Sequence, residues 1–213
     1  MSIVTMILGE SGTGKSASIR SLSPDEALII QSISKPLPFK SAHKPYAQGA
    51  GNIFVTDNHE HIVALAQKTK RKIIVLDDFQ YVMANEFMRS DVKGYEKFTD
   101  IGRHAWIILS ELAKLPADVR VYVISHTEST DDGRIKIKTV GRMLDEKICL
   151  EGMVTIVLRT AVDGGSYYLT TQNNGQDTVK SPMGLFNSIR IDNDLKAIDT
   201  AICEYYEITE EAK

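Results

Sequence analysis

An apolar run, a glycine-rich loop and a helical segment open the chain in that order, and they restrict its fold more than any other feature. Residues 3–8 are typical of a buried strand, and residues 15–22 of a helix that ends before Pro24. Between them, Gly9–Ser16 matches the pattern G-x-x-x-x-G-K-[ST] at every fixed position. Glycines let such a loop turn its backbone N–H groups toward phosphate oxygens. The sequence therefore predicts a phosphate-binding loop rather than an ordinary glycine turn.

The side chains of this loop add a charge and a metal ligand. Lys15 would place its ammonium group at the β- and γ-phosphates of a nucleotide, in both a binding and a catalytic role. The Ser16 hydroxyl would ligate Mg²⁺, and the amino end of the following helix would add partial positive charge. The predicted nucleotide contacts are Gly9, Glu10, Ser11, Gly12, Thr13, Gly14, Lys15, Ser16 and Ala17.

Length and composition fit one α/β domain. The chain has 213 residues, of which 43% are hydrophobic and 25% charged, enough for a sizeable core. The net charge of −3 means that any surface for nucleic acid has to be local. Two cysteines favour a reducing compartment over a disulfide framework, and no apolar run is long enough to span a bilayer. We therefore expect a cytoplasmic protein without membrane contacts.

Strand-like and helix-like segments alternate along most of the sequence. This alternation predicts an α/β fold, with a mostly parallel sheet, helices on both faces and the glycine loop at the carboxyl ends of the strands. Residues 153–160 and 166–172 flank the turn Asp163–Gly165 and predict an antiparallel hairpin. We expect a single domain over the whole chain, with a core of about 1–160 and a C-terminal hairpin and helix over about 161–213.

The helical patterns between the strands differ in strength. Apolar residues spaced alternately by three and four predict a helix over residues 95–115, closed by Pro116. Asp57 with Glu60 is typical of a capped helix start. Residues 83–94 look irregular.

Two apolar strands end in side chains suited to nucleotide chemistry. Asp77 follows residues 73–76 in the Walker B arrangement, where a carboxylate binds Mg²⁺ directly or through water. Asp78 would either orient an attacking water or cap the next helix. His126 follows the strand 119–125 and faces the γ-phosphate if that strand lies beside the glycine-loop strand; otherwise it is a strand-end histidine. The other histidines show no metal-ligand constellation.

Taken together, these residues resemble the RecA-type ATPase core. The order is a glycine loop, a strand ending in two aspartates, a long helix and a strand ending in histidine. More closely, the chain is similar to the small phage single-strand annealing recombinases that keep only this core. The resemblance covers most of the chain and is carried by Gly9–Ser16, Lys35–Phe39, Asp77 and Asp78, His126, Lys180–Pro182 and Asn193–Lys196.

The resemblance implies a RecA-like P-loop NTPase that uses ATP and Mg²⁺. It implies binding to single-stranded DNA, annealing or strand pairing in phage recombination, and homo-oligomers in the form of rings or filaments; a single-stranded DNA-binding protein is a further partner to test. The RecA family usually has a catalytic glutamate at the end of the second strand, whereas this strand ends in Gln31 and Ser32. Either Asp78 takes that task, or hydrolysis is slow and ATP serves mainly for assembly.

In RecA-type cores two loops face the DNA, and here they correspond to residues 84–97 and 127–140. Arg134, Lys136 and Lys138 alternate with isoleucines, so an extended chain would put these cations on one face. Such a row either tracks a phosphate backbone or protects an edge strand. The candidate DNA contacts in and beside both loops are Arg89, Lys93, Lys97, Arg134, Lys136, Lys138 and Arg142.

Lys180 follows the predicted hairpin. The resemblance implies that a basic residue in this area reaches the γ-phosphate held by a neighbouring subunit, a catalytic role in trans. A plain surface lysine is the alternative.

Two other classes of function compete with this interpretation. A phosphotransferase acting on a small molecule would need an arginine-rich lid, whereas the polar stretches here are rich in lysine. A nucleotide-gated ATPase of phage replication, similar to a helicase loader, would act through protein partners more than through DNA.

Overall fold

The computed structural model describes residues 1–91, 94–141, 144 and 147–209, which form an α/β structure on one nine-stranded sheet. The strand order is β3-β2-β4-β5-β1-β7-β8-β9, and β6 pairs with the far end of β5. In this order, the neighbouring strands β3, β2, β4, β5, β1 and β7 run parallel to one another. β6, β8 and β9 pair antiparallel with their neighbours. The strands are β1 (Ile3–Gly9), β2 (Ala27–Gln31), β3 (Ile53–Val55), β4 (Ile73–Asp77), β5 (Arg120–Ser129), β6 (Ile135–Ile137), β7 (Ile156–Asp163), β8 (Ser166–Thr170) and β9 (Arg190–Asp192).

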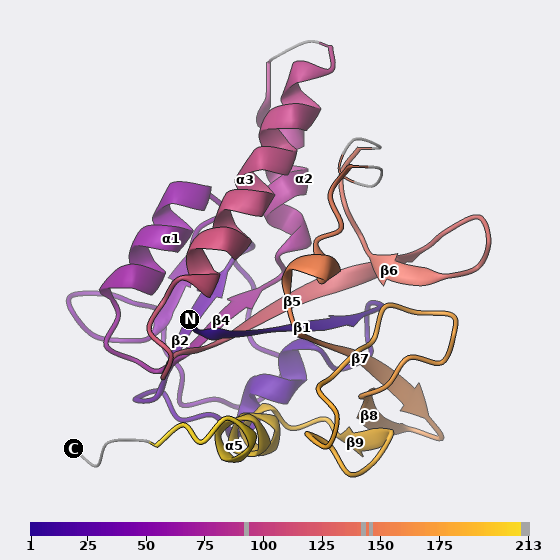
Figure 1. Ribbon diagram of the computed structural model, residues 1–213. Helices are drawn as coiled ribbons and strands as arrows, with labels where there is room; N and C mark the ends of the chain where they lie inside the picture. Colours follow the sequence, from indigo (N-terminus) through magenta and orange to yellow (C-terminus); the bar gives the residue numbers. More distant parts are fainter. Residues whose placement is uncertain (92–93, 142–143, 145–146, 210–213) are drawn as a thin grey trace.

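Helices cover both faces of the sheet (Figure 1). One face carries α1, α2 and α3, and the other carries the 3-10 helix η1 and the C-terminal helix α5 (Figure 1). The described helices are η1 (Ser16–Ser21), α1 (His59–Lys68), α2 (Gln80–Arg89), α3 (Glu96–Ala113), the short 3-10 helix η2 (Glu151–Met153) and α5 (Leu195–Tyr205).

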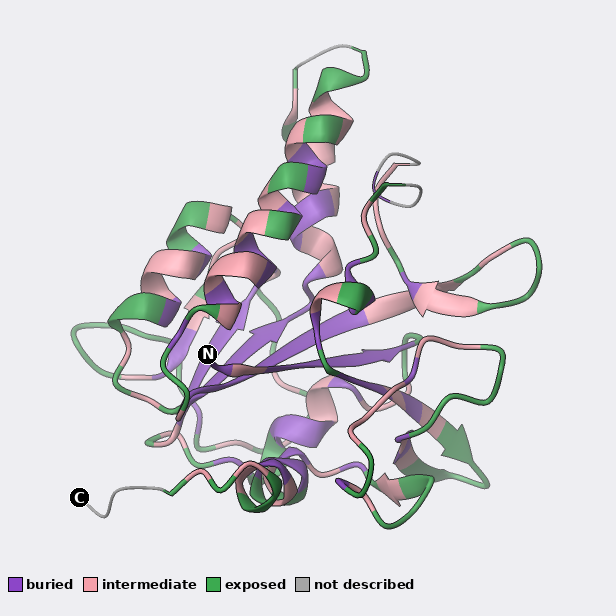
Figure 2. Ribbon diagram, in the orientation of Figure 1, coloured by how far each residue is buried: buried purple, intermediate pink, exposed green. Residues whose placement is uncertain are grey.

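The unbroken apolar composition of β4 follows from its position in the middle of these layers. Ile74 and Leu76 pack into the core under α1, α2 and α3, whereas Ile73 and Val75 pack into the core over η1 and α5. A strand covered on both faces needs apolar side chains at successive positions. Figure 2 shows the buried residues concentrated along the central strands and the inward sides of the helices.

Strand pairing brings the predicted chemical groups to one edge of the sheet. β5 lies between β1 and β4, and Gly9 at the end of β1 is paired in register with His126 in β5. Asp77 ends β4 opposite Gln31, the last residue of β2. Since these strands are parallel, the glycine loop and both strand-end positions share the carboxyl edge, where α/β sheets commonly bind ligands.

Several local expectations were wrong. Residues 83–94, expected to be irregular, contain most of α2, because Val82 and Met83 pack into the core and Phe87 packs against it. The cap of α1 is Asn58, whose side chain accepts from the His61 N–H, and not Asp57. The helix over residues 95–115 and the antiparallel hairpin of β7 and β8 are confirmed.

Across the residues that the structure describes, no helix has both the length and the apolar character needed to cross a membrane.

Candidate nucleotide site

A cleft of about 650 Å³ opens beside the glycine loop at the carboxyl edge of the sheet. It brings the predicted loop together with Asp78, which follows β4, and His126, which lies in β5. Gly9, Glu10 and Thr13 belong to the loop without lining the cleft. The lining residues are Ser11, Gly12, Gly14, Lys15, Ser16, Ala17, Ile33, Lys35, Pro38, Asp78, Tyr81, His126 and Tyr167.

The loop requires glycine at three positions, Gly9 and Gly14 of the pattern and Gly12 between them. Gly12 and Gly14 have φ angles of 82° and 88°, in the left-handed region that side-chain-bearing residues rarely adopt. A Cβ at Gly9 would overlap the hydroxyl of Thr160, which itself lies 2.6 Å from the Thr13 hydroxyl and donates to the Leu8 carbonyl. Thr160 in β7 therefore fixes the start of the loop, a contact across the sheet that the sequence pattern does not reveal.

Lys15 is buried, and its ammonium donates to the Glu10 carbonyl oxygen at 2.7 Å. Burial lowers its pKa to about 8, although the charges of Asp78 and Asp77 act in the opposite direction. The helix that follows is a 3-10 helix of six residues, so the predicted contribution of a helix macrodipole is smaller than expected. The full positive charge that the loop itself contributes therefore comes from Lys15.

Ser16 and Asp77 meet although β5 separates their strands. The Ser16 hydroxyl donates to Asp77 Oδ1 at 3.0 Å. Asp77 is completely buried, and its Oδ2 has no hydrogen-bond partner among the described residues. Burial, with the nearby charge of Asp78, raises the pKa of Asp77 to about 6.

This pair of oxygen donors fits Mg²⁺. A hydroxyl and a carboxylate with an unpaired buried oxygen, next to the glycine loop, are hard ligands of the kind that this ion prefers. In the described part of the chain, no group of three or more His, Cys, Asp or Glu side chains could hold a metal. Mg²⁺ would therefore complete its coordination with phosphate oxygens and water, as it commonly does.

Asp78 has a strained backbone and a paired side chain. Its φ of 63° lies in the left-handed region, and such strain in a non-glycine residue often marks a functional position. Its carboxylate forms an ion pair with Lys35 and lies 3.6 Å from His126 Nε2. Burial acts to raise the pKa of Asp78, but the contacts with His126 and Lys35 outweigh it and hold the pKa below its ordinary value. Asp78 does not cap α2, because the cap position is Phe79 and has no side-chain hydrogen bond.

Four residues of the site region are not among the predicted site residues, although the sequence offers Tyr81 as either a base-stacking or a core side chain, and Lys35 and Asn193 belong to motifs of the resemblance. Tyr81 and Tyr167 line the cleft, and Tyr81 packs edge-on against His126. Asn193, just before α5, donates to the Gly14 carbonyl at 2.9 Å. Lys35 entered the sequence analysis only as part of a motif of the resemblance. No residue spacing in the sequence predicts its ion pair with Asp78.

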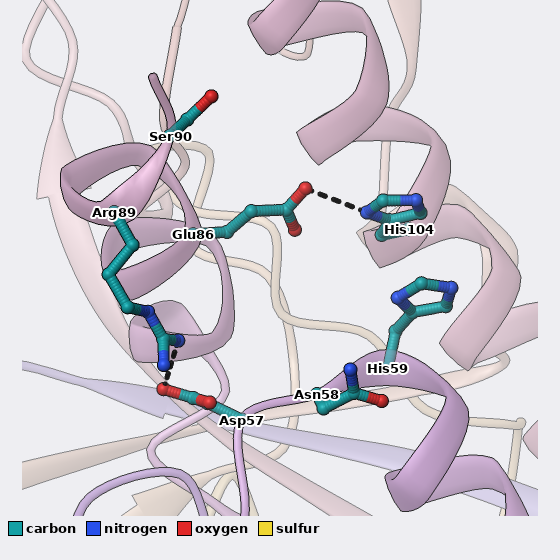
Figure 3. Close-up of a pocket in the computed structure, with 7 residues that line it drawn as sticks. All are labelled: Asp57, Asn58, His59, Glu86, Arg89, Ser90 and His104. Carbon is teal, nitrogen blue, oxygen red and sulfur yellow. Dashed lines mark hydrogen bonds and ion pairs between the residues drawn. The ribbon is translucent and has the colours of Figure 1, made fainter. Parts of the chain in front are cut away.

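Arg89, the candidate DNA contact on α2, lines a separate pocket between α1, α2 and α3 (Figure 3). Figure 3 shows Arg89 turned toward Asp57, with which it forms an ion pair at 2.6 Å, and His104 turned toward Glu86 at 2.7 Å. The His59 and His104 rings stack with centroids 3.8 Å apart, a cluster that the sequence did not indicate. Arg89 is therefore already neutralised by a carboxylate.

The remaining candidate of this first loop region is Lys97, whose ammonium lies over the Phe87 ring, 4.4 Å from its centroid. The segment expected to be an irregular DNA-facing loop is largely the end of α2 and the start of α3. Lys93 and Arg142 lie outside the described residues.

The second group of candidate DNA contacts lies on the hairpin of β5 and β6. Ile137 is buried and Lys138 beside it is exposed, whereas Ile135 and Lys136 are both half-buried, so the predicted alternation holds only in part. Arg134 lies 3.3 Å from Asp132, and Lys136 lies 3.4 Å from Glu128. The row of cations therefore exists, but acidic neighbours partly neutralise it.

Lys180 lies away from the cleft of its own chain. Its backbone pairs with Val157 in β7, where N–H and carbonyl groups exchange hydrogen bonds of 2.8 and 2.9 Å. It is absent from the residues that line the cleft. Any contact of Lys180 with a nucleotide would have to be made in a neighbouring subunit, so its catalytic role stays a prediction.

The geometry of the site is consistent with nucleotide chemistry, and comparison with known proteins adds no family to it. No protein-family model matches the chain, and no curated protein matches its sequence.

Proposed function

We propose that this protein is a Mg²⁺-dependent ATPase with a RecA-like P-loop core. The observation that carries the proposal is the 3.0 Å contact between the Ser16 hydroxyl and the buried carboxylate of Asp77, formed next to a glycine loop that holds a buried lysine. A glycine turn with no ligand would not require a buried ammonium and a buried carboxylate with an unpaired oxygen beside it.

In this proposal each residue has a defined task. The loop amides and Lys15 bind the β- and γ-phosphates, while Ser16 and Asp77 hold Mg²⁺. Bound Mg²⁺ would neutralise charge on the phosphate oxygens. Asp78 accepts a proton from the water that attacks the γ-phosphorus, as the bond to the bridging oxygen of ADP breaks and phosphate is released. His126, 3.6 Å from Asp78, reports on the terminal phosphate.

Titration calorimetry with Mg²⁺ and a non-hydrolysed ATP analogue tests the site. Lys15→Ala should weaken binding at least about 100-fold, because it removes the only ammonium that lies within the loop itself. Lys114→Ala, at the opposite end of the sheet, is a matched control and should bind like the wild type. An unchanged affinity of Lys15→Ala for the ATP analogue would contradict the proposal.

We further propose that ATP controls binding to single-stranded DNA in a phage recombination process, through homo-oligomers. The support is the row of cations on the β5–β6 hairpin and the proximity of that hairpin to His126 in β5. The alternative is a nucleotide-gated ATPase, similar to a helicase loader, that acts on protein partners. The ion pairs of Arg134 with Asp132 and of Lys136 with Glu128 favour this alternative, since they reduce the charge offered to DNA.

A further inference from the structure

The cleft contains a second lysine, Lys35, supplied by the loop that follows β2. Its ammonium forms an ion pair with Asp78, which lines the cleft together with His126. Lys35 and Lys15 therefore approach the cleft from different segments of the chain. Neither the glycine-loop pattern nor the strand-end acids assign Lys35 a task.

The backbone of Lys35 is fixed, whereas its side chain can move. The buried side chain of Gln31 donates to the Lys35 carbonyl at 3.2 Å. Two residues further along, Leu37 and then Phe39 pack against the core over η1 and α5. The Lys35 side chain itself is 40% exposed. This loop is thus anchored at both ends of the segment that carries the lysine, and the ammonium can be redirected without refolding the loop.

We propose that Lys35 binds the terminal phosphate of the nucleotide and exchanges Asp78 for that phosphate when the triphosphate enters. This proposal rests on the ATPase function proposed above. In the structure the ammonium neutralises a single carboxylate. A γ-phosphate offers more negative charge and several acceptor oxygens in the same cleft, so it competes for the ammonium.

The exchange would link nucleotide state to the reactive carboxylate. While Lys35 is paired with Asp78, it occupies one oxygen of the group that would accept a proton from water. Transfer of the ammonium to the γ-phosphate releases that oxygen and at the same time places positive charge where negative charge develops during phosphoryl transfer. ADP has no γ-phosphate and would leave the ion pair as it is.

Affinities for a non-hydrolysed ATP analogue and for ADP, measured by titration calorimetry with Mg²⁺, test this assignment. Lys35→Ala should weaken the ATP analogue about 10- to 100-fold and change ADP binding by less than about twofold. Lys35→Arg should recover most of the loss because it keeps the charge. Lys40→Ala is the matched control, since Lys40 is exposed in the same loop and does not line the cleft.

The outcomes separate the two proposals. Equal losses for both nucleotides in Lys35→Ala, or no loss for either, would overturn the role of Lys35 while wild-type binding that depends on Lys15 still supported the ATPase. A wild-type protein that binds neither nucleotide would overturn both. Thermal unfolding of each variant shows whether a loss of nucleotide affinity comes from misfolding. Lys35→Arg gives a second test if Lys35→Ala is unstable.

Discussion

Asp77, the proposed ligand of Mg²⁺, has a buried carboxyl group that is unfavourable to the fold when it is ionised. It is fully buried with an unpaired oxygen, and its pKa is raised from 3.8 to about 6. The folded state therefore holds a proton more tightly than the unfolded state does. The contribution of this carboxyl to the free energy of unfolding is fully present below pH 3.8 and is lost as the pH rises through 6. Without a bound ion, Asp77 destabilises the fold at neutral pH.

Asp77→Asn should accordingly raise the free energy of unfolding at pH 7 by about 1–3 kcal/mol and flatten its pH dependence between about 4 and 6. Urea denaturation in the presence of a chelator would measure both effects. The same variant should lose Mg²⁺-dependent ATP binding. Asp131→Asn, at an exposed position, is the control and should change neither property. A variant less stable than the wild type at pH 7 would contradict this account of Asp77.

Among the secondary-structure elements, α5 is attached to the sheet by a buried polar cluster. Asp199 in α5 accepts from Arg120 Nε and Nη2, each at 3.0 Å, and from the Tyr122 hydroxyl at 2.6 Å. Arg120 and Asp199 are each 1% exposed. Removing one member of such a pair leaves an uncompensated buried charge.

Asp199→Ala is therefore expected to lower the free energy of unfolding by about 3–5 kcal/mol. Asp118→Ala removes an ion pair with Lys72 at the surface and should cost only about 0–1 kcal/mol. Both values can be measured by urea denaturation. If the two substitutions cost the same, the cluster does not anchor α5.

The β5–β6 hairpin is the element on which DNA binding depends in the proposed function. Replacing Arg134, Lys136 and Lys138 together with alanine should weaken binding to labelled single-stranded DNA and reduce the slope of log affinity against log salt. The matched control replaces Lys68, Lys70 and Lys114, exposed lysines at the amino end of the sheet, and should leave the slope unchanged. An equal slope in both triple variants would exclude the hairpin as the contact and favour protein partners.

Across the entire chain, the sheet and the central part of the site could be predicted from the sequence. The apolar runs and the glycine loop are local patterns, and parallel strands bring their carboxyl ends to one edge, so Asp77, Asp78 and His126 could be expected near Lys15. Lys35 and Thr160 could not be expected there, because each reaches the site through a tertiary contact that no spacing in the sequence predicts. α2 was missed because it is short, and the three side chains that pack it onto the core, Val82, Met83 and Phe87, do not form a long periodic pattern.

The glycine loop also depends on residues from the far end of the sequence. Asn193 donates to the Gly14 carbonyl, Arg20 contacts the Asn193 carbonyl, and Ser21 donates to Asp194 at 2.5 Å. A ribosome synthesises the loop first and these supporting residues much later. A nascent polypeptide whose Asn193 is still inside the exit tunnel therefore has a loop without these contacts. If the proposed function is correct, it would bind a nucleotide well only after translation has passed that point.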